Sequence, residues 1–367
     1  MSTNQNKYQI HNYFMNLALQ QAMKSLGNTK LNPSVGCVIS DGKNLISAAC
    51  TSFNGRPHAE RNAINLSKRN IKNANLYTTL EPCIHYGKTP PCTNLIIKKK
   101  IKKVFFSIKD PDKRTFNKSK VKLKKNGIKV ASGFYSKKIN YFYKSYIKYK
   151  KNDLPFVTCK VAVSNDFYTI NKKKKIITNQ FSQGRVHLMR SSHDCLITSS
   201  KTVIQDNPML TCRINGLEKT SPARIILDKK LSTPLNSKVI KSANTFKTII
   251  FYNKVDKKKI KSLNKLNART IKVNLNKDGN INLREALLLV KKIGFNRIFI
   301  EAGLNLSVSF LKEKIVDEFK LFISHNNLKK SGKANIKKYL NRILKNNKYT
   351  NEKVNLAGDK LRTYQIK

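Results

Sequence analysis

The stretch PHAERNAINLSKRNIKNANLYTTLEPCIHYGKTPPC, residues 57–92, decides how the first half of this chain is interpreted. It contains His58 and Glu60 at its start and Cys83 and Cys92 toward its end. One histidine and two cysteines can hold a zinc ion in a tetrahedral site whose fourth position is left open for water. A water bound to zinc ionises near neutral pH and becomes a nucleophile. Because Glu60 follows His58 by two residues, we expect it to shuttle the protons of that water.

This arrangement is close to a known pattern and departs from it at one place. H-x-E followed by P-C-x-x-C is the signature of zinc deaminases, whereas here the second cysteine comes nine positions after the first. Each residue alone also fits an ordinary buried or surface side chain. The joint order favours a metal site, and three ligands with one open position favour catalysis over a structural zinc. His85 is an alternative ligand, although a substrate contact suits it better.

Hydrophobic periodicity predicts an α/β fold around these residues. Helices are expected over residues 12–26 and 58–68. Residues 81–83 are expected to end a strand and begin another helix, so that Cys83 and Cys92 lie at or near the start of that helix, where its dipole favours thiolates. Strands are predicted over residues 35–39, 44–50, 76–80, 104–108 and 127–130. The alternation places helices over a central sheet.

A Lys-rich, aromatic stretch over residues 137–155 is expected to form a helix and then a linker to a second domain. Its tyrosines fit either an RNA-stacking surface or a packed helix, and we favour packing because aromatic stripes are common in cores. The second half shows its own α/β alternation. Residues 198–208 are interpreted as a polar loop, and the chain from Lys329 as a polar tail with a final strand near 361–366. Helices are predicted over residues 182–190 and 283–293, and strands over 156–163, 195–198, 223–227, 248–251, 297–300 and 318–324.

The charge of the chain is extreme, with a formal net value of +54 over 367 residues. Such a balance suggests a nucleic-acid or membrane surface as partner. The lysines, however, are spread over the whole chain and accompany asparagine and isoleucine, the residues of A/T-rich codons. A biased genome therefore explains the charge, and we expect no specific nucleic acid as partner. A phosphorylated small molecule remains compatible with it.

The seven cysteines are odd in number and widely spaced, which does not suit a disulfide framework. Cys37, Cys159 and Cys195 lie in apolar, strand-like runs and are interpreted as small core residues. We see no signal peptide and no apolar run long enough for a membrane span. The expected compartment is the cytoplasm, with no membrane partner.

Three motifs in the first half resemble a known family. They are Asn32-Pro33-Ser34-Val35-Gly36-Cys37-Val38-Ile39, Pro57 to Glu60, and Leu80 to Cys92 with its T-P-P-C ending. The first half is similar to the cytidine-deaminase superfamily, and more narrowly to the deaminase domain of the bifunctional riboflavin-biosynthesis family. The resemblance implies one Zn²⁺ per chain, held by His58, Cys83 and Cys92, with Glu60 as the catalytic proton shuttle. Ile84 and Tyr86 depart from the family pattern without touching these ligands.

The second half resembles the reductase domain of the same family, whose fold is similar to dihydrofolate reductase. The run Asp194 to Arg213 matches the family motif D-x-x-L-x-S-x-x-T-V-x-x-D-[DN]-P-x-L-T-x-R almost throughout, and Glu301-Ala302-Gly303 matches E-[AG]-G. The resemblance implies NADPH as cofactor. The substrate contacts that it implies are Lys174, Arg190, Leu210, Arg213 and Glu301. The cofactor contacts that it implies are Ala162, Ile176, Thr202, Asp206, Gly303, Leu304, Asn305, Leu306, Ser307, Val308 and Ser309.

Two departures fall in this half. Phe167 stands where the family's S-x-D-G loop has glycine, a residue with greater backbone freedom. Ile176 stands where the family has a tryptophan that covers the cofactor, so we expect a weaker contact there. From charge alone, Arg190 and Arg213 could also grip a phosphate bidentately.

The leading hypothesis is a bifunctional riboflavin-pathway enzyme of α/β class, a deaminase over residues 8–150 and a reductase over residues 154–367. It would convert 2,5-diamino-6-(5-phosphoribosylamino)pyrimidin-4(3H)-one to 5-amino-6-(5-phosphoribosylamino)uracil by attack of zinc hydroxide, and then reduce the ribosyl group to a ribityl chain. We also expect a homo-oligomer, a dimer. The alternatives are a deaminase with a degenerate reductase domain and a basic RNA-binding or RNA-editing deaminase.

Overall fold

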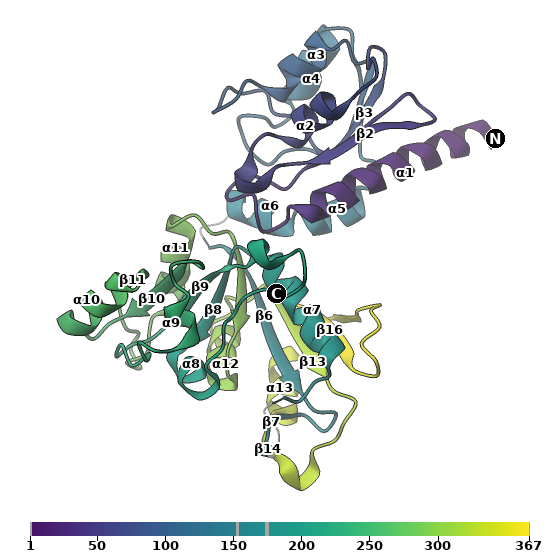
Figure 1. Cartoon of the computed structure of the whole chain (residues 1–367). Coiled ribbons are helices and arrows are strands. Elements are labelled where there is room, and N and C mark those ends of the chain that lie inside the picture. Colours follow the sequence, from purple (N-terminus) through teal and green to yellow (C-terminus); the bar gives the residue numbers. More distant parts are fainter. Residues whose placement is uncertain (1, 152–153, 173–175, 367) are drawn as a thin grey trace. The chain divides into compact units, whose positions relative to one another are not determined.

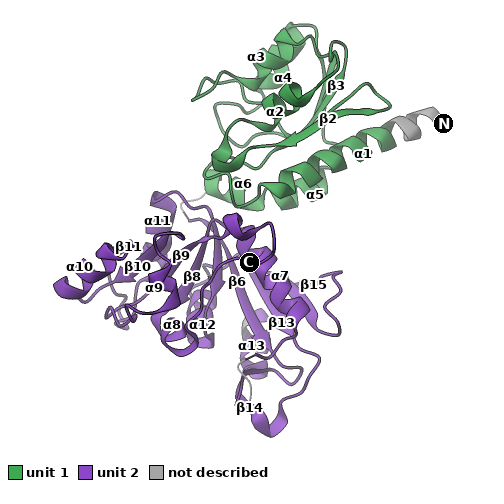
Figure 2. Cartoon of the chain, viewed as in Figure 1, with its two compact units in different colours: residues 1–152 green, residues 153–367 purple. Residues whose placement is uncertain are grey.

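The computed structural model describes residues 2–151, 154–172 and 176–366 (Figure 1). The chain divides into two compact units, unit 1 over Met1–Asn152 and unit 2 over Asp153–Lys367 (Figure 2). Each unit has a sheet and a hydrophobic core of its own. The predicted Lys174 lies outside the described residues. Over the described part of the chain, no helix combines the length and apolarity needed to cross a membrane.

Unit 1 is built on a five-stranded sheet in the order β2-β1-β3-β4-β5. β1 pairs antiparallel with β2 and β3, whereas β3, β4 and β5 run parallel. The strands are β1 Gly36–Ser40, β2 Leu45–Cys50, β3 Asn75–Leu80, β4 Lys103–Ile108 and β5 Lys129–Ser132. Every residue of β1 is buried, as expected of a strand covered on both faces.

Helices pack on this sheet and bury their apolar sides. They are α1 Ser2–Lys24, α2 Ala59–Leu66, α3 Cys92–Lys98, α4 Lys118–Lys125, α5 Ser136–Phe142 and α6 Lys144–Lys151. α1 approaches β1 so closely that a Cβ on Gly36 would overlap the carbonyl oxygen of Ala18. Tyr143, which follows α5, and Tyr146 of α6 are buried in the core of unit 1. The packing interpretation of the aromatic stretch is therefore confirmed for these two tyrosines.

Unit 2 contains a nine-stranded sheet in the order β11-β10-β9-β8-β12-β6-β13-β16-β15. Its strands run parallel from β11 to β13, and β16 and β15 complete it with antiparallel pairing. The strands are β6 Phe156–Val163, β8 Cys195–Ser199, β9 Ala223–Leu227, β10 Thr248–Tyr252, β11 Ala268–Lys272, β12 Arg297–Glu301, β13 Glu318–Ile323, β15 Tyr349–Asn351 and β16 Lys360–Gln365. A separate two-stranded antiparallel sheet pairs β7 (Tyr168–Asn171) with β14 (Gly332–Asn335), which lie far apart in the sequence.

The helices of unit 2 include three that lie near the predicted site. α7 covers Gln180–Ser191, α8 covers Ser200–Asp206 and α12 covers Leu304–Lys312. The others are α9 Lys238–Lys241, α10 Lys257–Lys265, α11 Leu283–Lys292 and α13 Lys337–Leu344. Cys37, Cys159 and Cys195 are fully buried in strands, which confirms their interpretation as core residues.

The sequence expectation was wrong at two places in this unit. The predicted polar loop at 198–208 contains α8, because the Ser199 side chain accepts a hydrogen bond from the Thr202 N–H and caps a helix whose residues are mostly polar. The predicted polar tail also forms β14, α13 and β15. Leu340 and Leu344, four residues apart on α13, are both buried in the core, a pattern that the surrounding lysines and asparagines obscured.

Candidate functional site

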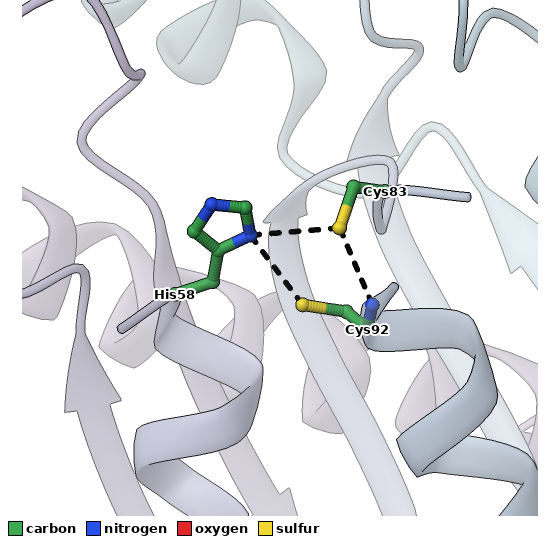
Figure 3. A group of neighbouring side chains, drawn as sticks. All are labelled: His58, Cys83 and Cys92. Atoms are coloured by element: carbon green, nitrogen blue, oxygen red, sulfur yellow. Dashed lines mark hydrogen bonds between the residues drawn. The ribbon is translucent and has the colours of Figure 1, made fainter. Parts of the chain in front are cut away.

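Three predicted metal ligands from distant parts of the sequence converge in unit 1. The ligand atoms of His58, Cys83 and Cys92 all lie within 4.8 Å of one another (Figure 3). His58 is the residue immediately before α2, Cys92 is the first residue of α3, and Cys83 lies in the loop after β3. Among the described residues, this is the one such group of three or more histidine, cysteine or acidic side chains.

The geometry of the three side chains fits a zinc ion. The Nδ1 atom of His58 lies 3.5 Å from the Sγ atom of Cys83 and 3.5 Å from that of Cys92. A tetrahedral zinc at about 2.3 Å from sulfur and about 2.1 Å from nitrogen would separate those atoms by roughly 3.6 Å. In addition, the Cys92 N–H donates to the Cys83 sulfur at 3.3 Å. The donor set and its spacing therefore suit zinc with three protein ligands.

The local structure differs from the expectation for one of the cysteines. Cys83 does not begin a helix, because residues 81–91 form a loop and α3 starts only at Cys92. The two prolines before Cys92 lack the amide hydrogen that a longer helix would need. The Cys83 sulfur instead receives the amide of Cys92 at the start of α3. Hydrogen bonding with Cys92, together with that from His58, lowers the pKa of Cys83 to about 4 although burial opposes it.

Glu60 reaches the same place from the first turn of α2. It is only 3% exposed, and its Oε2 atom lies 3.5 Å from the Cys92 sulfur. Burial, followed by the charge of Cys83, raises the pKa of the Glu60 carboxyl. A carboxylate with a raised pKa accepts a proton more readily than an exposed carboxylate does. The structure thus brings Glu60 into reach of the position that the three ligands leave open.

A pocket opens onto His58 and Glu60, and the turn after β4 forms part of its wall. Asp110 and Asp112 line this pocket and are largely buried. Asp110 accepts a hydrogen bond from the Tyr146 hydroxyl at 3.0 Å, and burial raises its pKa to about 6. His85 lines the pocket too, so it lies where a substrate contact was predicted and outside the ligand triad. Asp110 was not predicted from the sequence, because a single aspartate after a strand is common.

A second group of predicted residues gathers at the carboxyl ends of two neighbouring strands of unit 2. β8 and β12 are parallel neighbours, and α8 and α12 begin just after them. The Gly303 N–H donates to the Thr202 hydroxyl at 3.4 Å, which joins the two turns. Crevices outside the carboxyl ends of parallel strands are the usual ligand sites of open α/β sheets.

Glu301, at the end of β12, forms the ionic centre of this group. Both carboxylate oxygens of Glu301 accept from the Arg190 guanidinium, each at 2.8 Å. Arg190 also donates to the Thr211 carbonyl at 2.8 Å and is largely buried. Arg190 is therefore engaged by a carboxylate rather than standing ready to grip a phosphate. Lys160 of β6, which the sequence reasoning missed, places its Nζ atom 3.9 Å from Glu301.

Burial and charge set the protonation of these side chains. Burial by itself would raise the pKa of Glu301, but the Arg190 charge and hydrogen bonds outweigh it and lower the pKa to about 2. Burial lowers the pKa of Lys160, with partial compensation by Glu301. His187, one turn before Arg190 on α7, accepts a hydrogen bond from the Arg213 N–H at 3.0 Å. Burial, followed by the charges of both arginines, lowers the pKa of His187 to about 4.

The remaining predicted contacts of the second site are placed as follows. Leu210 is buried and adopts a positive φ of 57°, whereas the Arg213 side chain is exposed. Ile176 is 55% exposed. Asp206 is exposed at the end of α8, and Ala162 is half-buried on β6. The residues predicted around α12 are Gly303, Leu304, Asn305, Leu306, Ser307, Val308 and Ser309, of which Ser307 is fully buried.

Comparison with known proteins divides the chain in a similar way. Residues 8–108 match the model of the cytidine and deoxycytidylate deaminase zinc-binding region, and residues 155–325 match that of the RibD C-terminal domain. The chain is 33% identical to the riboflavin biosynthesis protein RibD of Bacillus amyloliquefaciens over 317 residues, which cover 86% of this chain and 84% of that protein. It is also 33% identical to RibD of Aquifex aeolicus, over 86% of this chain and 87% of the relative.

Solved structures resemble both units together. A RibD structure from Acinetobacter baumannii has a TM-score of 0.82 and 27% identity, and the match covers 98% of this chain and 99% of that one. The Thermotoga maritima diaminohydroxyphosphoribosylaminopyrimidine deaminase/5-amino-6-(5-phosphoribosylamino)uracil reductase has a TM-score of 0.83 and 27% identity, with the same coverage. The predicted α/β architecture of both halves is confirmed by these matches.

The metal centre predicts a specific loss in the variant His58→Ala. Because three protein ligands would fall to two, we expect zinc content to drop from about one per chain to near zero after dialysis. Metal analysis of the purified chain measures it, and His325→Ala, which removes a histidine from unit 2, should keep the wild-type zinc content. Stoichiometric zinc in His58→Ala would mean that the ligand set is wrong.

The Arg190–Glu301 pair predicts a pH-dependent stability difference. Glu301→Gln leaves a buried guanidinium without its counter-charge, so we expect unit 2 to lose about 3–5 kcal/mol of unfolding free energy at pH 7. The pKa of Glu301 is depressed from 4.5 to about 2. Its contribution is therefore present above pH 4.5 and is lost as the pH falls toward 2.

Urea unfolding at several pH values measures this difference. The difference in unfolding free energy between wild type and Glu301→Gln should become smaller as the pH falls below 4.5. The exposed control Glu218→Gln should have the unfolding free energy of wild type at every pH. A gap that stays constant down to pH 2.5 would contradict the assignment of the stabilisation to the ionised carboxylate.

Proposed function

Because the chain belongs to the family of the riboflavin biosynthesis protein RibD, we propose that it catalyses two consecutive steps, the deamination of a phosphorylated pyrimidine and the reduction of its sugar. The deaminase is assigned to residues 8–150 and the reductase to residues 154–367. One observation carries the proposal, namely that His58, Cys83 and Cys92 converge beside a buried Glu60. The name of the Thermotoga maritima relative supplies the substrates, a diaminohydroxyphosphoribosylaminopyrimidine and then a 5-amino-6-(5-phosphoribosylamino)uracil.

In the deaminase, His58, Cys83 and Cys92 would hold one zinc ion. When bound there, zinc supplies Lewis acidity that lowers the pKa of water at the open position. Glu60 accepts a proton from the attacking water and delivers it to the ring nitrogen. It then carries the second proton, from the hydroxyl that has been added to the ring carbon, to the amine, which leaves as ammonia. Its raised pKa supports this double role. The walls of the pocket orient the pyrimidine, with His85 and Asp110 placed to donate or accept hydrogen bonds.

In the reductase, the turns after β8 and β12 would receive the cofactor, which we propose is NADPH. Thr202 and Gly303 join these turns, and Gly303 precedes α12, whose N-terminus can bind phosphate. Asp206, Ala162, Ile176 and the first residues of α12 complete the proposed cofactor contacts. Substrate would lie against Glu301, with Arg190 and Lys160 fixing the carboxylate and with Leu210, Arg213 and Lys174 as further contacts.

We also propose a cytoplasmic homodimer, with small molecules rather than nucleic acid or membrane as ligands. The seven cysteines are all free thiols, which suits a reducing compartment.

Glu60→Gln tests the deaminase. The amide keeps the volume of the side chain but cannot accept the proton, so we expect about one zinc per chain and a deamination rate lower by about 10²–10⁴-fold. Ammonia release from the phosphorylated diaminopyrimidine and metal analysis measure the two quantities. Full activity in this variant would remove Glu60 from the mechanism, and Glu313→Gln in unit 2 is the control for a lost carboxylate.

Oxidation of NADPH with the deaminated product tests the reductase. We expect turnover by the wild type, and we expect Ile176→Trp to lower the KM for NADPH about 3–10-fold because an aromatic ring adds contact area and stacking over the cofactor. Ile170→Trp, at an exposed position of β7, is the matched control and should leave KM unchanged. No oxidation at saturating NADPH would contradict the reductase and favour a deaminase with a degenerate second domain.

A further inference from the structure

The deaminase pocket is lined by charged side chains of both signs, and two of its lining cations share one carboxylate. Asp112 pairs with Arg114 at 2.7 Å and with Lys150 at 2.8 Å. Hydrogen bonds from Arg114, reinforced by Lys150, hold the pKa of Asp112 well below its usual range. These two cations therefore have a carboxylate partner already and are poorly placed to take a second anion.

The other acidic side chains of the pocket are also satisfied. Glu81 is buried and accepts from the Ser119 hydroxyl at 2.8 Å and from the amide of Asn117 at 3.1 Å. Asp110 accepts from Tyr146. Glu60 faces the metal ligands. None of these carboxylates is within ion-pair distance of the one lining cation that remains, Arg56.

Among the described lysine and arginine side chains that line the pocket, Arg56 alone forms no ion pair. It lies two residues before His58 and is half-buried. Its NH1 atom donates to the Thr89 hydroxyl at 2.8 Å, a neutral partner. A guanidinium has five N–H donors, so most of them remain available to a ligand.

Arg56 also meets the insert that separates the two cysteines. Gly87, another lining residue, lies so close that a Cβ there would be 3.0 Å from the NH2 atom of Arg56. Thr89 belongs to the T-P-P-C run of the same insert. The guanidinium is thus held at the pocket wall between the loop before α2 and the insert.

We propose that Arg56 binds the phosphate of the deaminase substrate and so determines the preference of this site for a phosphorylated pyrimidine. The inference rests on the proposed function and extends it to a residue outside the metal and proton-transfer machinery. A planar guanidinium binds a phosphate through two parallel hydrogen bonds. An uncompensated, half-buried cation inside a pocket is the feature that such a dianion requires, because partial desolvation strengthens the attraction.

A purely structural role makes a different prediction. If Arg56 served only to tie the insert to the loop before α2, its loss would disturb the site equally for every substrate. If it binds phosphate, its loss matters only when the phosphate is present. The two roles are separated by removing the side chain and the phosphate singly and together.

The experiment measures ammonia release from the phosphorylated diaminopyrimidine and from the same compound after enzymatic dephosphorylation. For Arg56→Gln we expect kcat/KM to fall about 10–100-fold with the phosphorylated substrate and to stay within about twofold of wild type with the dephosphorylated one. Arg56→Lys keeps the charge but loses the two parallel donors of the guanidinium. Its kcat/KM with the phosphorylated substrate should lie between that of wild type and that of Arg56→Gln. Arg69→Gln, at an exposed position after α2, is the matched control and should behave as wild type.

A second measurement uses ribose 5-phosphate as the probe. It should inhibit deamination by wild type competitively, and Arg56→Gln should need at least tenfold more of it. Equal losses on both substrates, or unchanged inhibition by ribose 5-phosphate, would overturn the phosphate assignment. Zinc content and NADPH oxidation report whether each variant is folded. If Arg56→Gln is not folded, the comparison of the phosphorylated and dephosphorylated substrates is made with Arg56→Lys instead, and it tests the proposal in the same way.

Failure of the wild type to release ammonia would instead contradict the proposed function. In that case calorimetry of ribose 5-phosphate binding to wild type and Arg56→Gln tests the phosphate site by itself. Tighter binding by wild type would support it, and equal binding would overturn it.

Discussion

The convergence of one nitrogen and two sulfur atoms within 4.8 Å is the constraint on which unit 1 depends. It fixes where α2 and α3 must begin, since His58 immediately precedes one helix and Cys92 starts the other. It also requires the insert between the cysteines to fold back over the site. The three ligand atoms must keep tetrahedral distances around one metal ion. A shift of about an ångström in any one of them would therefore break the site.

The second unit depends on a different kind of interaction. The pair between Arg190 and Glu301 links α7 to the end of β12, and the Thr202–Gly303 hydrogen bond links the turn after β8 to the turn after β12. Both contacts join segments about a hundred positions apart. The Glu301 carboxylate, which we propose contacts the substrate, is therefore held ionised by a buried cation. The two turns that would receive the cofactor are joined by a weaker, neutral hydrogen bond. A deaminase that needs a metal and a reductase that needs an ordered crevice are thus assembled by separate means in separate cores.

Much of the fold and of the two candidate sites could be predicted from residues 57–92 and 194–213, because a motif of fixed spacing is associated with one local backbone geometry. Most strands of the two sheets followed from apolar runs, as β9 and β10 illustrate, whereas β11 was not predicted. The helix α8 was missed because a polar segment gives no periodic signal, and its N-cap is visible only when Ser199 meets the Thr202 amide. β14 and α13 were missed because they are stabilised by contacts with distant parts of unit 2. β15 was missed because its polar residues give no apolar signal, and it pairs with β16.

The sequence by itself determined the kinds of atoms available for chemistry, namely a histidine, two cysteines and a glutamate in an order typical of zinc deaminases, followed by a second motif-bearing half. Only the tertiary structure decided which charges are free. Arg190 was predicted as a phosphate ligand but forms an ion pair with Glu301. Arg56 was not predicted as a ligand, and it lines the deaminase pocket without a carboxylate partner. The physical reason is that ion pairing depends on distance in space, which a linear order of residues does not contain.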